Sequence, residues 1–455
     1  MMTAWRLAPL YVAAAAFAIA VSLPGGDPDT YWHLASGKWM VEHGQLLRAD
    51  VFSSTANGAP YSVGEWLGEL AIYGAYVLGG WAGLAILRAM LVAIGAFFIT
   101  RVALRAAPAP FAIAVAAIAL ALSEITWTDR PQLFTFALFP LVFELLIVAR
   151  AGRTRLLFIV PPLILLWTNL HGGYALGLAL VAIFAAEAVL TRRNVFPFAA
   201  AAVLAVVASF IDPGSLGLGA AAAHATSPPR FIVEEAPPDI LRPAGFVFAL
   251  FGLATLGLAL ARGGTLLDAL LLVPLLWLGL SAQRHMPYFA LAATPYIASG
   301  LADLWWRWRP ASRFRLPRPV VVGLGAGLVA MVVASVATAP FAPLETQYPT
   351  AARAKLAETS GNLLNEYDWG GYLIWRVPER PVFIDGRLFV FLPDVLTEYE
   401  EMVFMRPGWR DQLDRHAIAQ VLIRPDRPLA VALRELGWTV VSEDATALLL
   451  QRPPR

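Results

Sequence analysis

The chain has 455 residues, of which 58% are hydrophobic and 15% are charged. Soluble domains carry roughly 25% charged residues, so this composition argues against an ordinary water-soluble fold and indicates a chain that folds in lipid. A formal net charge of +2 argues against nucleic acid as a partner. The absence of cysteine excludes disulfides and thiolate-bound zinc.

The first apolar run extends from Leu7 to Leu23, behind the single basic residue Arg6. A run of this kind is either a cleaved signal peptide or a retained first helix. We predict a retained helix, because no good small-residue cleavage site precedes the polar stretch that begins at Asp27.

Further apolar runs approach the roughly 20 residues that an α-helix needs to cross a bilayer. They lie near 84–100, 108–122, 131–148, 156–167, 174–190, 195–211, 244–260, 265–280, 287–301 and 320–337. We therefore predict that residues 1–340 form an all-α polytopic bundle of about eleven transmembrane helices, with a first outer loop at 24–82. Residues 66–78 are also apolar, but if they crossed the membrane, every later loop would lie on the opposite side of it. We predict a helix at the outer interface there, with a re-entrant hairpin as the alternative.

The basic residues divide unevenly between the two sets of loops. The inner set holds Arg6, Arg101, Arg105, Arg150, Arg153, Arg155, Arg192, Arg193, Arg262, Arg307, Arg309, Arg313, Arg315 and Arg318. The outer set holds Lys38, Arg48, Arg130, Arg230, Arg242 and Arg284. Basic residues concentrate on the cytoplasmic side of membrane proteins, so the second set faces outward. The expected location is a bacterial cytoplasmic (inner) membrane.

Residues 341–455 change character, because charges and short alternating segments replace the long apolar runs. Residues 419–423, 438–441 and 447–450 are typical of strands, and 428–436 are typical of a helix. The sequence therefore predicts a small C-terminal extracytoplasmic α/β domain.

Polar motifs gather in the outer loops. Asp27 followed by Pro28 is typical of a helix start, with Asp27 as the N-cap. Asp29 then lies in the first turn, where the helix dipole favours a carboxylate, and His33 follows on the same helical face. An Asp and a His at that spacing could share a metal, although a polar contact at the interface explains them as well.

Later outer segments contain Asp129, His171 and the pair Arg284-His285. Asp129 is also a candidate helix cap, and His171 a polar residue at a helix end. Arg284 is suited to binding a phosphate through its forked donors, or to reaching lipid head groups. Arg88 lies inside a predicted span, where a cation needs a partner, and we expect a first-loop acid or Glu65 to provide it.

Carboxylates, histidines and arginine on one face of a helical bundle are suited to chemistry on a charged lipid head group. A carboxylate can act as general base, and arginine can stabilise a leaving phosphate. The candidate phosphate-binding residues are Arg284, His285, Arg88, His171 and Glu65.

The chain resembles the C-type superfamily of glycosyltransferases (GT-C), which transfer sugars from polyprenyl-phosphate or polyprenyl-diphosphate donors. Protein O-mannosyltransferases and oligosaccharyltransferases belong to it. The resemblance rests on Asp27-Pro28-Asp29 with Trp32-His33, Gly64-Glu65-Trp66-Leu67, Asp129 and the C-terminal outer domain. The segments 367–372 and 383–387 also look like those of uncharacterised bacterial relatives, without a reaction attached to them.

The resemblance implies that Asp29 is catalytic, with Asp27 as the alternate, and that Asp129 either joins it or holds a divalent metal ion such as Mg²⁺ or Mn²⁺. His33, through its spacing from Asp29, is the other candidate metal ligand. Oligosaccharyltransferases usually carry paired acids in the second outer loop, whereas this chain has one, and this departure weakens the expectation of metal dependence. The implied partners are a polyprenyl-linked sugar donor, membrane lipids and an acceptor of unknown identity. The implied activity is transfer of a hexose or pentose to an acceptor hydroxyl. The alternative is a lipid or solute transporter, or flippase, that uses the same outer cavity.

Overall fold

The structure is a computed structural model that describes residues 4–61, 64–213, 233–308 and 317–454. Arg230, Arg309, Arg313 and Arg315 of the predicted loops lie outside the described residues. The chain forms two compact units. Unit 1 comprises residues 1–23 and 85–340, and unit 2 comprises residues 24–84 and 341–455. The first outer loop and the C-terminal residues therefore belong to one compact unit.

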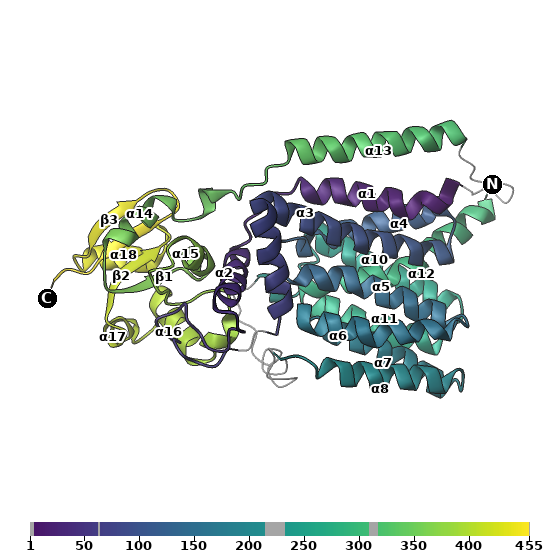
Figure 1. Ribbon diagram of the computed structural model, residues 1–455, viewed down its shortest axis with the longest axis horizontal. Coiled ribbons are helices and arrows are strands. Elements are labelled where there is room, and N and C mark those ends of the chain that lie inside the picture. The colour runs from purple at the N-terminus through teal and green to yellow at the C-terminus, as the bar shows by residue number, and fades with distance from the viewer. Residues whose placement is uncertain (1–3, 62–63, 214–232, 309–316, 455) are drawn as a thin grey trace. The chain divides into compact units, whose positions relative to one another are not determined.

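Unit 1 is a bundle of apolar helices that lie side by side (Figure 1). Its helices are α1 (Ala8–Val21), the C-terminal part of α3 (Trp66–Ala106), α4 (Ala109–Ala121), α5 (Gln132–Arg150), α6 (Val160–Leu170), α7 (Tyr174–Leu190), α8 (Val195–Ser209), α10 (Pro243–Ala261), α11 (Leu266–Ser281), α12 (Met286–Trp308) and α13 (Arg318–Thr338). Each apolar run that was predicted to span the membrane falls on one of these helices.

Several helices have the length and composition that a bilayer requires. Among the described residues, four are long and apolar enough to cross a membrane, namely Trp66–Ala106, Gln132–Arg150, Pro243–Ala261 and Pro319–Thr338. Six further apolar helices are shorter. The chain is therefore a multi-pass membrane protein, and the count of eleven spans stays a prediction.

Helix α3 is interrupted by two glycines. Gly79 (φ −152°, ψ 16°) and Gly80 (φ 58°, ψ −141°) leave the helical conformation, and the positive φ of Gly80 is one that residues with a Cβ rarely adopt. The interruption separates residues 66–78, predicted to form an interfacial helix, from the predicted span that begins near residue 84. Whether 66–78 lies at the interface or re-enters the membrane stays a prediction.

Unit 2 packs helices around a small mixed sheet. Its helices are α2 (Pro28–His43), the N-terminal part of α3, α14 (Thr350–Glu358), α15 (Gly370–Arg376), α16 (Asp394–Val403), α17 (Trp409–Arg415) and α18 (Pro428–Glu435). Its strands are β1 (Asn362–Asn365), β2 (Ile418–Ile423), β3 (Thr439–Glu443) and β4 (Leu448–Gln451), in the order β1-β2-β4-β3. Strand β1 is parallel to β2, whereas β4 is antiparallel to both β2 and β3. The predicted strands and the helix at 428–436 are confirmed, and β1 was not predicted.

One hydrophobic core explains why α2 belongs to this unit. Tyr31 of α2 is buried with Leu363 of β1, Tyr372 of α15 and Leu422 of β2. The rings of Tyr31 and Tyr372 meet edge to face, with centroids 5.4 Å apart. Asp27 and Asp29 lie at the start of helix α2, so the C-terminal part of the chain fixes their position.

Candidate active site

Helix α2 begins with the two acids of the Asp27-Pro28-Asp29 motif. Asp27 is the N-cap, and its Oδ1 accepts the backbone N–H of Asp29 at 2.9 Å. Pro28 occupies the first helical position, where no intrahelical N–H is needed. The cap accounts for Asp27 without a catalytic role. Asp29, which is half-buried, is the acid whose presence helix capping does not require.

The Asp29 carboxylate has two close neighbours in unit 2. Trp32 Nε1 donates to Asp29 Oδ1 at 3.0 Å. Gly386 lies against the same oxygen, because a Cβ built on Gly386 would come 2.0 Å from Asp29 Oδ1. No side chain can occupy that space while the carboxylate stays where it is. The backbone of a C-terminal segment thus forms one wall of the Asp29 environment.

His33 lies one helical turn after Asp29 and is buried. Its Nδ1 lies 3.3 Å from Oε1 of the buried Glu69, and its ring packs on Trp32 with centroids 3.5 Å apart. Glu65, which is half-buried, stands one turn before Glu69, and its carbonyl accepts the Glu69 N–H at 2.9 Å. The structure therefore places His33 against a carboxylate of the α3 segment.

The predicted metal ligands, Asp129 and His33, belong to different compact units. In the part of the chain that the structure describes, no group of three or more His, Asp or Glu side chains could hold a metal ion. Mg²⁺ requires several oxygen ligands in octahedral geometry. The described residues of either unit therefore do not fit a preformed Mg²⁺ site. The divalent ion stays a prediction.

Arg88 and Asp129 form a buried ion pair in unit 1. Arg88 Nη1 donates to Asp129 Oδ2 at 2.9 Å, and both side chains are almost fully buried. Arg88 also donates through Nε to the carbonyl of Ala20 at 3.1 Å and through Nη2 to that of Leu23 at 2.6 Å. We expected a first-loop acid or Glu65 as its partner, whereas the structure gives Asp129 of the second outer loop.

Two outer arginines of unit 1 pair with consecutive glutamates. Arg284 forms an ion pair with Glu235, and Arg130 Nη2 lies 2.9 Å from Oε1 of Glu234. The glutamates belong to the short 3₁₀ turn Val233–Glu235, which our reading of the sequence did not single out. Two adjacent acids in a loop that faces two arginines are a signal that charge patterning can detect.

His171 follows α6 and is half-buried. Its Nδ1 accepts the backbone N–H of Gly173 at 2.9 Å, and it lies 2.7 Å from Thr135 Oγ1. Trp167 Nε1 donates to the same Thr135 oxygen at 2.8 Å, so the Thr135 hydroxyl is directed toward His171. Nδ1 is therefore an acceptor, and the neutral ring carries its proton on Nε2.

Burial and, after it, the nearby Arg130 and Arg284 guanidinium groups together lower the pKa of His171 to about 3. Burial, with Arg284 as the second cause, also lowers the pKa of His285 to about 4. Both histidines are neutral at pH 7. Since Arg130 follows Asp129 directly in the chain, unit 1 gathers Asp129, His171 and Arg284 in one region. Their meeting with Asp29 would join the two units and stays a prediction.

The segment 383–387, to which the sequence attached no role, contains the charged residues Asp385 and Arg387. Both side chains are fully buried, and Arg387 forms ion pairs with Asp385 and with Asp50 of the first outer loop. In the nearby segment 367–372, Gly370 begins helix α15 and Gly371 packs on the backbone of Pro28. The contacts of Arg387 with Asp50 and of Gly371 with Pro28 join residues far apart in the chain, so no local pattern could indicate them.

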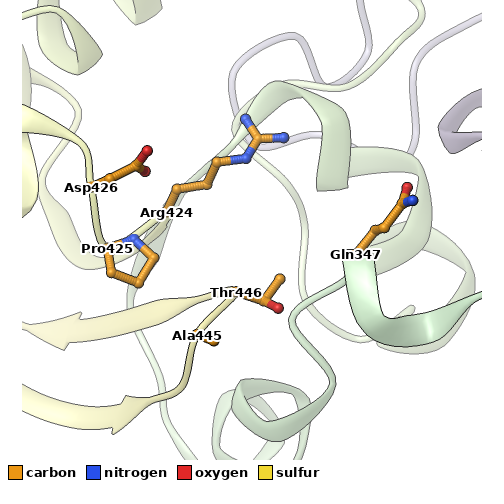
Figure 2. A pocket seen from close by; sticks show the side chains of 6 residues that line it. All are labelled: Gln347, Arg424, Pro425, Asp426, Ala445 and Thr446. Carbon is orange, nitrogen blue, oxygen red and sulfur yellow. The ribbon is translucent and has the colours of Figure 1, made fainter.

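Figure 2 shows a cavity of about 500 Å³ in the C-terminal part of unit 2. Arg424, Pro425 and Asp426 line it after the end of β2, opposite Gln347 and the Ala445-Thr446 turn. Arg424 also pairs with Asp368 at 2.7 Å. The lining contains none of the predicted site residues.

Comparison with solved structures identifies the fold. The crystal structure of the Archaeoglobus fulgidus oligosaccharyltransferase in its apo form is similar over 92% of this chain and 69% of that one, with a TM-score of 0.56 and 12% identity. The oligosaccharyltransferase AglB from the same organism, in complex with an inhibitory peptide and a dolichol-phosphate, covers the same shares with a TM-score of 0.54 and 11% identity. No family model and no curated protein matches the chain. At this identity the likeness shows the fold alone, which is similar to that of an archaeal oligosaccharyltransferase.

Proposed function

We propose that the chain is a membrane glycosyltransferase that moves a sugar from a polyprenyl-phosphate-type lipid donor to an acceptor hydroxyl on the outer membrane face. The observation that carries the proposal is the likeness in fold to an archaeal oligosaccharyltransferase over 92% of the chain. One of the two similar structures is a complex with dolichol-phosphate, a polyprenyl phosphate, which supports a donor of this chemical class.

In the proposed reaction, Asp29 is the general base. The acceptor oxygen attacks the anomeric carbon as its proton passes to the Asp29 carboxylate. The bond between that carbon and the phosphate oxygen breaks, and the lipid phosphate leaves with the electron pair. The configuration at the anomeric carbon is inverted. The hydrogen bond from Trp32 to Asp29 Oδ1 supports this role, because it limits the rotation of the carboxylate.

Arg284 would stabilise the negative charge on the departing phosphate, with His285 as a neutral donor beside it. A phosphate that binds Arg284 replaces or joins the carboxylate of Glu235, which pairs with that arginine in the structure. We assign Arg88 an indirect part, because its Nε, Nη1 and Nη2 atoms each donate to an oxygen of the protein. It would hold Asp129 and the outer end of α1 in place.

The test is release or transfer of radiolabelled hexose from synthetic polyprenyl-phosphate hexoses by the purified full-length protein. Asp29→Asn should lower the rate by about 10²–10⁴-fold, the usual contribution of a positioned general base. Asp411→Asn is the matched control, because Asp411 is exposed in α17 and far in the chain from the site, and it should leave the rate unchanged. Loss of activity in Asp27→Asn but not in Asp29→Asn would move the assignment to Asp27. A wild-type protein that cleaves none of these donors would reject the proposed function.

The proposal also requires Asp29 and Arg284 to face the same donor. The chain has no cysteine, so this requirement can be tested with single pairs of introduced thiols. Asp29→Cys with Arg284→Cys should react with a short bis-maleimide, whereas Asp29→Cys with Arg101→Cys should not, because Arg101 lies in the opposite set of loops. Cross-linking of neither pair, or of both pairs alike, would contradict a shared cavity.

A further inference from the structure

The segment Asp385-Gly386-Arg387 is held by buried charges at both of its ends. Arg387 Nη2 donates to Asp385 Oδ2 at 2.6 Å and Nε donates to Asp385 Oδ1 at 2.9 Å. The same Oδ1 accepts the backbone N–H of Arg387 at 2.9 Å. The carboxylate therefore closes a loop around Gly386 and restricts the backbone torsions of that glycine.

Asp50 anchors this loop to the first outer loop. Arg387 Nη1 lies 2.6 Å from Asp50 Oδ1, and all three charged side chains are fully buried. Asp50 Oδ2 accepts the N–H of Ser53 at 3.1 Å and its hydroxyl at 2.6 Å. The guanidinium carbon of Arg387 lies 4.9 Å from the ring centroid of Phe52. The guanidinium is thus enclosed, and it has little freedom to move.

Backbone hydrogen bonds continue the same connection. Val382 donates to the carbonyl of Phe52 at 3.1 Å, and the Ser54 N–H donates back to Val382 at 2.8 Å. Thr55 Oγ1 donates to the carbonyl of Phe383 at 2.6 Å. The residues just before Asp385 are therefore paired, as a short strand would be, with the first outer loop. Position 386 is set by residues from both parts of unit 2.

Gly386, at the centre of this anchored segment, lies against the carboxylate of Asp29. A Cβ at position 386 would lie 2.0 Å from Asp29 Oδ1, 3.1 Å from Asp29 Cγ and 2.8 Å from Trp32 Nε1. The two groups that it would displace are the proposed base and the donor that holds it. Neither can retreat without changing the hydrogen bond between Trp32 and Asp29.

We infer that Gly386, held by the buried Asp50–Arg387–Asp385 cluster, is a positioning residue that sets the orientation of the Asp29 carboxylate. The inference rests on the proposed function of Asp29 as base. A displacement of about 1 Å at a reacting group can reduce a rate on the order of 10²-fold, so the contact is large enough to control turnover. The C-terminal domain would then act on the reaction through the geometry of Asp29.

The first experiment is Gly386→Ala in the full-length protein, assayed with the same polyprenyl-phosphate hexoses. The kcat should fall on the order of 10²-fold while the KM for the donor changes little. The substitution disturbs proton transfer from the acceptor to Asp29 and leaves binding of the lipid donor intact. The matched control is Gly74→Ala in the first part of α3, where an added Cβ meets open space. It should keep the wild-type kcat. An unchanged kcat in Gly386→Ala would overturn the inference.

A second variant separates positioning from folding. Trp32→Phe keeps an aromatic ring but removes the N–H that reaches Asp29 Oδ1. Without that donor the carboxylate binds protons more readily, so the acid limb of the pH profile of kcat/KM should move to higher pH. Gly386→Ala should move the acid limb in the same direction, since it disturbs the same hydrogen bond. A variant that is only misfolded would have a lower kcat/KM at every pH, and the acid limb of its profile would stay where it is in the wild type.

A third measurement does not depend on activity. Gly386→Ala should lower the Tm in the wild-type background and should lower it by less than half as much in an Asp29→Ala background, where the clash with the carboxylate is absent. Equal losses in both backgrounds would show that Gly386 does not act on Asp29. If the wild-type protein cleaves no donor, the proposed function fails. The comparison of Tm losses in the two backgrounds still decides whether Gly386 contacts Asp29.

Discussion

Two buried arginines, Arg88 in unit 1 and Arg387 in unit 2, hold the outer segments of the chain in different ways. Arg88 pairs with the carboxylate of Asp129 and donates to two backbone carbonyls at the end of α1. Arg387 pairs with two carboxylates, those of Asp50 and Asp385. One arrangement is formally neutral and the other carries one excess negative charge.

The difference follows from what surrounds each arginine. The last carbonyls of a helix lack their usual i+4 N–H partners, and an arginine from a neighbouring helix can donate to them without a second carboxylate. A loop such as 50–55 instead offers N–H and hydroxyl donors, and Ser53 supplies both to Asp50. These donors stabilise the second carboxylate. The helical bundle of unit 1 thus provides backbone carbonyls at a helix end as acceptors for its buried arginine. The loop-rich unit 2 provides a second buried carboxylate instead.

The largest effect is expected when the doubly paired arginine is removed. Arg387→Met leaves two buried carboxylates near each other without a cation, so the free energy of unfolding should fall by at least the roughly 3–5 kcal/mol of a broken buried pair. Thermal unfolding of the purified protein, followed by the fluorescence of its tryptophans, measures this loss. Arg434→Gln is the control, because its pair with Glu443 is exposed and contributes at most about 1 kcal/mol. Similar losses in the two variants would contradict the assignment of Arg387.

A smaller and reversible effect is expected at the neutral pair. Arg88→Met should cost about 3–5 kcal/mol because it leaves Asp129 buried without its cation. Adding Asp129→Leu should restore most of that stability, since replacing both members of a buried pair is often neutral. The corresponding rescue at Arg387 should fail with Asp385→Leu alone, because Asp50 remains. If Asp385→Leu does restore the stability of Arg387→Met, the second carboxylate, Asp50, does not need the Arg387 cation, and the contrast with Arg88 is wrong.

The smallest effect concerns the half-buried His171, which unit 1 keeps neutral at pH 7. Its pKa is lowered from 6.5 to about 3 when the chain folds, mainly by burial and then by Arg130 and Arg284. Between these pH values the unfolded chain binds more protons, so stability falls as pH falls. From pH 6.5 to pH 5 the loss should be roughly 1.5–2 kcal/mol.

His171→Gln should remove that part of the pH dependence, as measured by Tm at pH 7, 6 and 5. His285→Gln is a useful comparison, because the pKa of His285 is also lowered, to about 4, and its substitution should remove a similar part. An unchanged slope in His171→Gln would mean that the histidine is already protonated, or already accessible, in the folded protein.

The periodicity and composition of the chain were sufficient to predict the apolar helices of unit 1 and three of the four C-terminal strands. An apolar run of bilayer length becomes a helix whatever it later packs against, because its backbone must satisfy its own hydrogen bonds. The cap formed by Asp27 and Pro28 was equally readable, since it involves neighbouring residues only. These features depend on interactions between residues that are close together in the sequence, so the sequence alone predicts them.

Contacts between distant residues could not be predicted in the same way. The partner of Arg88, the pairing of Asp50 with Arg387 and the approach of Gly386 to Asp29 depend on which segments the core of unit 2 and the bundle of unit 1 bring together. Any acid in the outer loops satisfies the requirement that a buried arginine be paired, and any glycine can begin a turn. Residue types alone leave many such partners equivalent, and packing in three dimensions selects one of them.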